Sequence, residues 1–107
     1  MRAQDTIAAI ATPPGVGGIA ILRLSGPEAE RILTALCGRA RWESHRLYYC
    51  RLRHAGRTLD EAMAVLMRAP RSYTRQDVAE IQCHGGEVVC RNVLEAALAL
   101  GARPAQP

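Results

Sequence analysis

Strict alternation of apolar and polar side chains in the segment Val78–His84 constrains the fold more than any other feature of the chain. One face carries the apolar residues and the other carries the polar ones: Ala79, Ile81 and Cys83 against Glu80, Gln82 and His84. Since successive side chains of a strand point to opposite faces, this pattern predicts a strand with one face in a core. The polar face has two interpretations: an exposed face typical of antiparallel sheets, or the wall of a binding pocket.

A second segment, Ile19–Ser25, shows the same two-sided pattern. Leu22 and Leu24 share one face, and Arg23 lies on the other. If the polar face is a pocket wall, Arg23 is a candidate neighbour of Glu80. A carboxylate presents two acceptor oxygens in one plane, so it can take two parallel N–H donors from a guanidinium or from an aminopyrimidinone ring.

Shorter apolar or alternating runs predict further strands at Thr6–Ala11, Arg46–Arg53 and Thr58–Arg68. We expect the last two to form a hairpin, because Gly56 between them can adopt a positive φ angle. The C-terminal segment 102–107 is a candidate for one more strand.

Two helices are predicted from the spacing of apolar residues. The first follows Ser25 and ends at Gly38, and the second covers residues 87–100. The start of the first helix has two interpretations. Either Ser25 and Glu28 form a capping box, or Gly26 is the N-cap residue.

The predicted order of elements is β-β-α-β-β-β-α. Together with a length of 107 residues, this order predicts one α+β domain covering residues 1–107. We expect a two-layer sandwich, in which two main helices pack on a mixed, largely antiparallel sheet.

The glycines of Gly15–Gly18 raise the question of a phosphate-binding loop. Such a loop needs the N-terminus of a helix directly after it, whereas the predicted strand Ile19–Ser25 follows here. The Lys-Ser/Thr pair of a P-loop is also missing. The pattern therefore argues against a nucleotide loop and leaves a tight turn or a loop beside a ligand.

All 14 basic residues are arginines, and six of them lie between Arg39 and Arg57 with Glu43 as the only acid there. The net charge of +4 permits contact with nucleic acid without requiring it. This segment is either a solvated loop and strand face or a nucleic-acid patch.

The four cysteines show neither a CxxC pair nor the spacing of zinc ligands. The sequence also shows no signal peptide and no apolar run of membrane-spanning length. We therefore expect reduced structural thiols in a cytoplasmic protein without a metal site or a membrane partner. No Ser-His-Asp or paired-carboxylate constellation can be assembled from the spacing, so the residues predict a binding domain with no catalytic residue of its own.

Three stretches in this order closely resemble the N-terminal domain of the MnmE (TrmE) family of tRNA-modification GTPases. They are "DTIAAIATPPGVGGIAILRLSGPEA" (Asp5–Ala29), "DEAMAVLMRAPRSYTRQDVAEIQCHGG" (Asp60–Gly86) and the final "GARPAQP". The resemblance covers essentially the whole chain, and the first two motifs are highly specific.

The resemblance implies a fold similar to the tetrahydrofolate-binding domains of the glycine-cleavage T-protein type. It implies that the domain binds 5-formyltetrahydrofolate and forms a homodimer. By position in the motifs, Arg23 and Glu80 match the family's folate contacts, with Glu80 as the partner of the ring N–H groups. Arg23 would meet polar or anionic parts of the cofactor.

In this family the full protein acts with MnmG on carbon 5 of the tRNA wobble uridine, adding an aminomethyl-type group. The helical domain and the G domain, which binds GTP, Mg²⁺ and K⁺, are absent from this chain. No GxxxxGK[ST] or NKxD motif occurs in it. The resemblance thus implies a GTPase at full length and no GTP hydrolysis by these 107 residues alone.

Three positions depart from the family pattern. Val16 replaces a frequent basic residue, Arg75 with Gln76 replaces a common Gly-Glu, and Cys83 replaces a frequent glycine. We expect the first to affect an anion contact, the second to affect the shape of its loop, and the third to leave less room beside the ligand.

Two other functions fit the residues less well. The first is an arginine-rich module that contacts tRNA through Arg39–Arg57 and binds no folate. The second is a free-standing enzyme of the T-protein type, with Cys83 or His84 in its chemistry.

Overall fold

Strands and helices follow the order that the sequence pattern predicts. The computed structural model describes residues 5–11, 18–72 and 75–105. The elements are β1 (Ile7–Ile10), β2 (Ile19–Ser25), α1 (Ala29–Cys37), β3 (Leu47–His54), β4 (Arg57–Met67), β5 (Val78–His84), α2 (Glu87–Ala99) and β6 (Arg103–Pro104).

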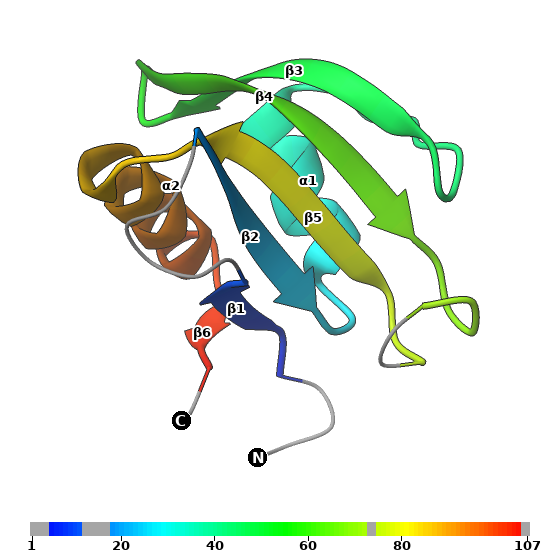
Figure 1. Ribbon diagram of the computed structural model, residues 1–107. Coiled ribbons are helices and arrows are strands. Elements are labelled where there is room, and N and C mark those ends of the chain that lie inside the picture. The colour runs from blue at the N-terminus through cyan, green and yellow to red at the C-terminus, as the bar shows by residue number, and fades with distance from the viewer. Residues whose placement is uncertain (1–4, 12–17, 73–74, 106–107) are drawn as a thin grey trace.

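One mixed sheet contains all of these strands in the order β3-β4-β5-β2-β1-β6 (Figure 1). Neighbouring strands are antiparallel, except that β6 runs parallel to β1. The predicted α+β fold with a largely antiparallel sheet is therefore confirmed. The predicted C-terminal strand is confirmed as the short β6.

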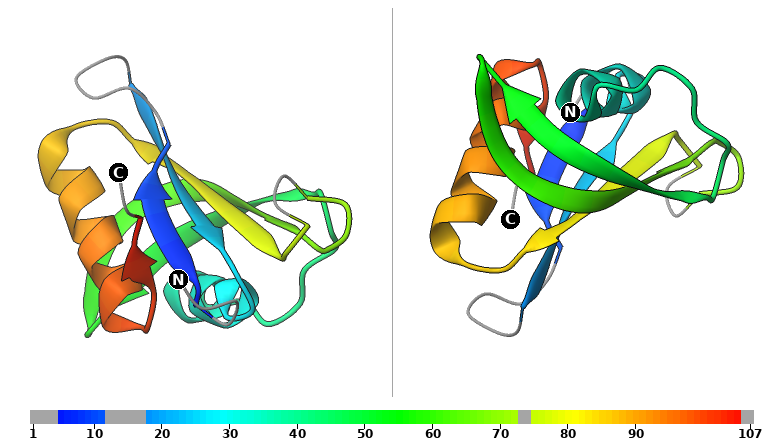
Figure 2. Two further views of the ribbon diagram at one scale, coloured as in Figure 1. Left: turned by 90° about the horizontal axis from the view of Figure 1, so that it is seen from below. Right: turned by 90° about the horizontal axis from the view of Figure 1, so that it is seen from above.

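Both helices pack on the same face of the sheet, which we call the inner face (Figure 2). Leu22, Leu24 and Ile81 lie there, fully buried in one core with α1 and α2. The opposite face, the outer face, carries Arg23 and Glu80. The two-sided patterns of β2 and β5 are thus confirmed.

Part of the outer face is itself buried. Val65, Met67 and Val78 form a second buried cluster there, separate from the main core. This cluster places apolar surface beside the polar residues of β5.

The hairpin of β3 and β4 has the predicted turn at Gly56, with a φ angle of +79°. Ala55 before it also has a positive φ, +52°. Two central residues with positive φ are typical of the two-residue turn whose twist matches that of the strands.

The start of α1 differs from both predictions. The N-cap residue is Glu28, and it has no side-chain cap of its own. The Glu28 N–H group instead donates a hydrogen bond of 2.8 Å to Thr6 Oγ1, from the residue directly before β1. Ser25 cannot cap the helix because it still belongs to β2, where it pairs with Val78.

Gly26 has a positional role rather than a capping one. Its φ angle is +142°, and a Cβ atom there would lie 2.6 Å from Thr6 Cα. A glycine is therefore required for the chain to pass Thr6 on its way into α1. The other end of α1 is as predicted: Gly38 adopts a φ of +69° and donates its N–H group to the Thr34 carbonyl.

Neither of the described helices is long and apolar enough to cross a membrane.

We predict that Thr6→Val lowers the free energy of unfolding by about 1–2 kcal/mol, because the Glu28 N–H group loses its acceptor while the side-chain volume is kept. Urea denaturation measures the loss, and amide exchange at Glu28 should become faster. Thr58→Val, the same change at an exposed position, is the control and should have little effect. Equal losses for the two variants would contradict the role of Thr6.

Candidate functional site

Arg23 and Glu80 lie directly opposite each other on the two central strands. The register of β2 and β5 pairs their Cα atoms. Arg23 Nε donates to Glu80 Oε2 at 2.8 Å, and Arg23 Nη2 lies 2.6 Å from the same oxygen. The pairing of these two predicted site residues follows from the sheet register, because residues of one cross-strand pair share a face.

The Glu80 carboxylate is largely buried, with 10% of its side chain exposed, against 39% for Arg23. Both contacts with Arg23 go to Oε2. Oε1 has no hydrogen-bond partner among the described residues. Those residues also contain no polar side-chain atom that is both enclosed and unpaired. Oε1 therefore faces a space that solvent or a ligand can reach.

Apolar side chains flank this carboxylate. Val65 on β4 pairs with Glu80 and is buried, while Met63 and Ile21 lie on either side of Gln82 in the next row. Gln82 is half-buried, and its amide makes no hydrogen bond with the described residues. An acceptor oxygen that is open on one side and flanked by apolar side chains suits a ligand that combines an N–H donor with apolar surface.

His84 is not part of this ion pair. It lies four residues further along β5, about 13 Å away at the usual rise of a strand. Its side chain is 71% exposed, and Asp60 of β4 holds it from one side. Asp60 Oδ2 accepts the His84 N–H group at 2.7 Å, and Oδ1 lies 2.8 Å from Nδ1.

Asp60 is a residue that the sequence reasoning missed. Burial by itself would raise the pKa of this carboxyl, but the hydrogen bonds from His84 and the Glu61 N–H group outweigh burial and lower its pKa below the usual value. Nothing in the local sequence points to this contact. It lies beyond Met63 and Gln82, the last residues that pair β4 with β5 at this end.

Cys83 corrects one expectation. Its side chain lies on the inner face, 1% exposed, with Sγ 3.5 Å from the Ala20 carbonyl oxygen. It therefore takes up volume in the core and leaves the space beside Glu80 unchanged. Burial raises the pKa of the Cys83 thiol to about 11, so the thiol is not a ready nucleophile.

The other three cysteines, like Cys83, are free thiols. Burial raises the pKa of Cys37 well above the usual range, as does the neighbouring Cys50. Within the part of the chain that the structure describes, no three His, Cys, Asp or Glu side chains gather as metal ligands would.

The arginines between Arg39 and Arg57 do not form one patch. β3 separates Arg39 and Arg46 from the hairpin end with Arg53 and Arg57, and its eight residues span about 26 Å. Arg39 stacks on the Tyr48 ring at 3.7 Å.

Glu43 and Glu61 each pair with one arginine of this segment, Arg46 and Arg51 respectively. The charge of the segment is therefore divided between two ends of the sheet.

The glycine loop is described only at its end. Residues 12–17, Val16 among them, lie outside the described residues. Gly18 accepts the Gly85 N–H group at 2.9 Å, which extends the pairing of β2 and β5. The loop before β5 also differs from the family pattern, with Arg75 in place of a common glycine. Arg75 adopts a positive φ of +63°, a conformation that a glycine would favour.

The profile of a protein family described as "GTP-binding protein TrmE N-terminus" matches residues 6–107. Curated proteins named "tRNA modification GTPase MnmE" are similar to the chain over 97–100% of its length. The protein from Geobacter metallireducens is 55% identical over 113 residues, that from Chlamydia felis 50% over 109, and that from Chloroflexus aurantiacus 54% over 110. The chain spans about a quarter of the length of these relatives.

We predict that Arg23→Met lowers the free energy of unfolding by about 1–3 kcal/mol, because it leaves the buried Glu80 carboxylate without its partner. The double variant Arg23→Met/Glu80→Leu should recover most of this loss. Arg51→Met, which breaks the exposed pair with Glu61, is the control and should cost less than about 0.5 kcal/mol. Urea denaturation of wild type and the three variants measures these losses. Equal losses for Arg23→Met and Arg51→Met would contradict a stabilising role of the Arg23–Glu80 pair.

Proposed function

Because the chain belongs to the family of TrmE N-terminal domains, we propose that it is the part of a tRNA-modification GTPase that binds formyl-tetrahydrofolate and forms a homodimer. The observation that supports the folate site is the Glu80 carboxylate. It is largely buried, one oxygen is held by Arg23, and the other has no partner among the described residues.

The residues at this site fit such a cofactor. The aminopyrimidinone edge of a pterin offers two neighbouring N–H donors, and a carboxylate oxygen is their natural acceptor. Arg23 fixes the orientation of the carboxylate through Oε2 and leaves Oε1 for the ligand. Arg23 is itself partly exposed and can meet polar or anionic parts of the cofactor. Val65 and Ile21 supply apolar surface for the ring.

When bound, 5-formyltetrahydrofolate supplies a one-carbon unit. In the full protein, together with MnmG, this unit would go to carbon 5 of the wobble uridine of tRNA in the cytoplasm. The residues of this chain bind and orient the cofactor, and the proposal assigns no catalytic residue to them. GTP, Mg²⁺ and K⁺ would be bound by a G domain outside this chain. A fold like that of the T-protein folate domains is part of the same proposal.

Exposed apolar side chains support a second subunit on the outer face. Ile19, Leu47 and Tyr49 are 59%, 48% and 64% exposed, and all three lie on this face of the sheet. Leu47 and Tyr49 are neighbours on the edge strand β3, and Ile19 lies three strands away on β2. Exposed large apolar side chains on one face favour an interface, since water solvates them poorly. We therefore propose this face for the homodimer.

For the cofactor, we predict that Glu80→Gln weakens binding of 5-formyltetrahydrofolate about 10–100-fold, because a neutral amide replaces the charged acceptor of two N–H groups. Isothermal titration calorimetry measures both affinities. Glu61→Gln is the control, as it makes the same change on the neighbouring strand and should leave the affinity unaltered. Equal affinity for wild type and Glu80→Gln would overturn the site.

For the homodimer, we predict that sedimentation velocity gives twice the 11.6 kDa mass of the chain. Tyr49→Arg should shift the protein to the monomer, because it buries a charge in the proposed interface. Val88→Arg, at a side chain equally exposed on α2, should leave the dimer intact. A monomer at every concentration would contradict dimerisation, and a dimeric Tyr49→Arg variant would contradict the face.

A further inference from the structure

A pocket of about 390 Å³ lies at the end of the sheet where β3 begins and β4 ends. It is formed by the segment before β3 and the loop after β4, and its lining residues are Ser44, His45, Arg68, Ala69, Pro70 and Arg71. Neither residue of the proposed folate site lines it. The pocket therefore needs an explanation of its own.

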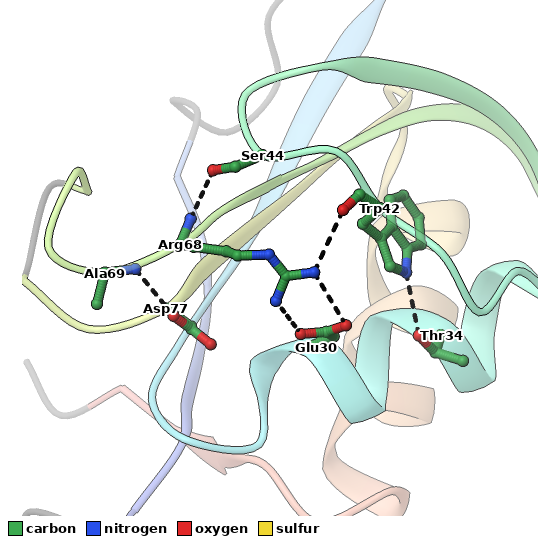
Figure 3. A network of polar contacts seen from close by, with 7 residues as sticks. All are labelled: Glu30, Thr34, Trp42, Ser44, Arg68, Ala69 and Asp77. Atoms are coloured by element: carbon green, nitrogen blue, oxygen red, sulfur yellow. Dashed lines mark hydrogen bonds and ion pairs between the residues drawn. The ribbon is translucent and has the colours of Figure 1, made fainter.

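Arg68 builds one wall of this pocket by joining three parts of the chain (Figure 3). Its guanidinium donates to both carboxylate oxygens of Glu30 in α1, at 2.5 and 3.3 Å, and to the Trp42 carbonyl oxygen at 3.2 Å. Its backbone N–H group donates to Ser44 Oγ at 2.9 Å. The segment before β3 is thereby fixed against the end of β4.

The next residue is fixed in the same way. The Ala69 N–H group donates to Asp77 Oδ1 at 2.9 Å, which ties the loop after β4 to the segment before β5 (Figure 3). Both walls of the pocket are thus held by hydrogen bonds to neighbouring elements. Such support positions a binding site before the ligand arrives, which lowers the entropy lost on binding.

His45 presents one ring nitrogen for a ligand. Ser44 Oγ lies 2.8 Å from its Nδ1, and Ser44 Oγ already accepts the Arg68 N–H group. In the tautomer in which the Ser44 hydroxyl donates to Nδ1, the ring proton is on Nε2, and the contact proposed below requires this tautomer. Nε2 has no hydrogen-bond partner among the described residues. The backbone of His45 has a left-handed φ of +69°, and its N–H group donates to the Leu66 carbonyl oxygen at 2.8 Å.

Two arginines line the pocket, and two acidic side chains lie near it. Glu30 forms an ion pair with Arg68, whereas Asp77 accepts the Ala69 N–H group and keeps its negative charge. Arg71 is exposed, and its guanidinium has no acidic partner among the described residues. The pocket therefore combines an uncompensated arginine with a histidine donor.

We propose that this pocket binds a phosphate group of tRNA. The planar guanidinium of Arg71 donates two parallel hydrogen bonds to phosphate oxygens, and His45 Nε2–H donates a third. That the ligand is an anion is argued from the Arg71 guanidinium, which has no acidic partner among the described residues and lines the pocket together with His45. That the anion belongs to RNA rests on the proposed function, in which this chain is part of a tRNA-modifying protein.

Two titrations of the ¹⁵N-labelled chain test this site, one with inorganic phosphate and one with an unmodified tRNA transcript at several salt concentrations. The expected result is that both shift the amide signals of residues 44–45 and 69–71. The variants are Arg71→Gln and His45→Asn, since asparagine tolerates a positive φ. Arg57→Gln, an arginine without an acidic partner at the far hairpin turn, is the matched control.

We expect Arg71→Gln to weaken tRNA binding about tenfold. The number of counterions released on binding, given by the slope of log affinity against log salt concentration, should fall by about one. His45→Asn should weaken it to a smaller extent, and Arg57→Gln should leave it nearly unchanged. Equal losses for Arg71→Gln and Arg57→Gln would overturn the pocket, because they would indicate general charge attraction. Shifts with phosphate but none with tRNA would support an anion site and overturn the RNA assignment.

Unaltered affinity of Arg71→Gln for 5-formyltetrahydrofolate is the further control, since it separates this pocket from the folate site. If wild type binds no folate but tRNA binding still depends on Arg71, the proposed folate function fails and the phosphate pocket stands.

Discussion

The antiparallel pairing of β2 with β5 is the interaction on which the rest of the structure depends. These two strands are the centre of the sheet, and their register sets Leu22 against Ile81 on the inner face and Arg23 against Glu80 on the outer face. A slip of one residue would move the apolar side chains of one strand to the solvent and its charges into the core. The main core and the ion pair therefore specify the same register, from opposite faces.

The same register gives the outer face its chemistry. A buried carboxylate is costly unless it is paired and hydrogen-bonded, and the Arg23 guanidinium satisfies only one Glu80 oxygen. The other oxygen lies among apolar side chains and is left for solvent or a ligand. A carboxylate with one oxygen left open can accept a hydrogen bond from a cofactor. This is why the folate proposal depends on Glu80 more than on any exposed polar residue.

Contacts between distant segments decide the details that surround this centre. Thr6 caps α1 from a position 22 residues away, and Asp60 holds His84 over 24 residues. Arg68, directly after β4, contacts α1 over 38 residues and shapes the pocket that His45 and Arg71 line. The basic segment Arg39–Arg57 is divided by β3, so charges that are close in sequence serve opposite ends of the sheet.

The sequence by itself determined the elements, their order and the face on which each strand residue lies. These follow from local rules: the two-residue period of a strand, the apolar spacing of a helix and the positive φ that Gly38 and Gly56 permit. Even the inward direction of Cys83 was contained in the alternation of β5. The cap of α1, the Asp60 contact and the phosphate pocket were decided only by the tertiary structure. Each is a hydrogen bond or a cavity between segments far apart in the chain, and no local periodicity encodes which distant side chain will satisfy a given polar group.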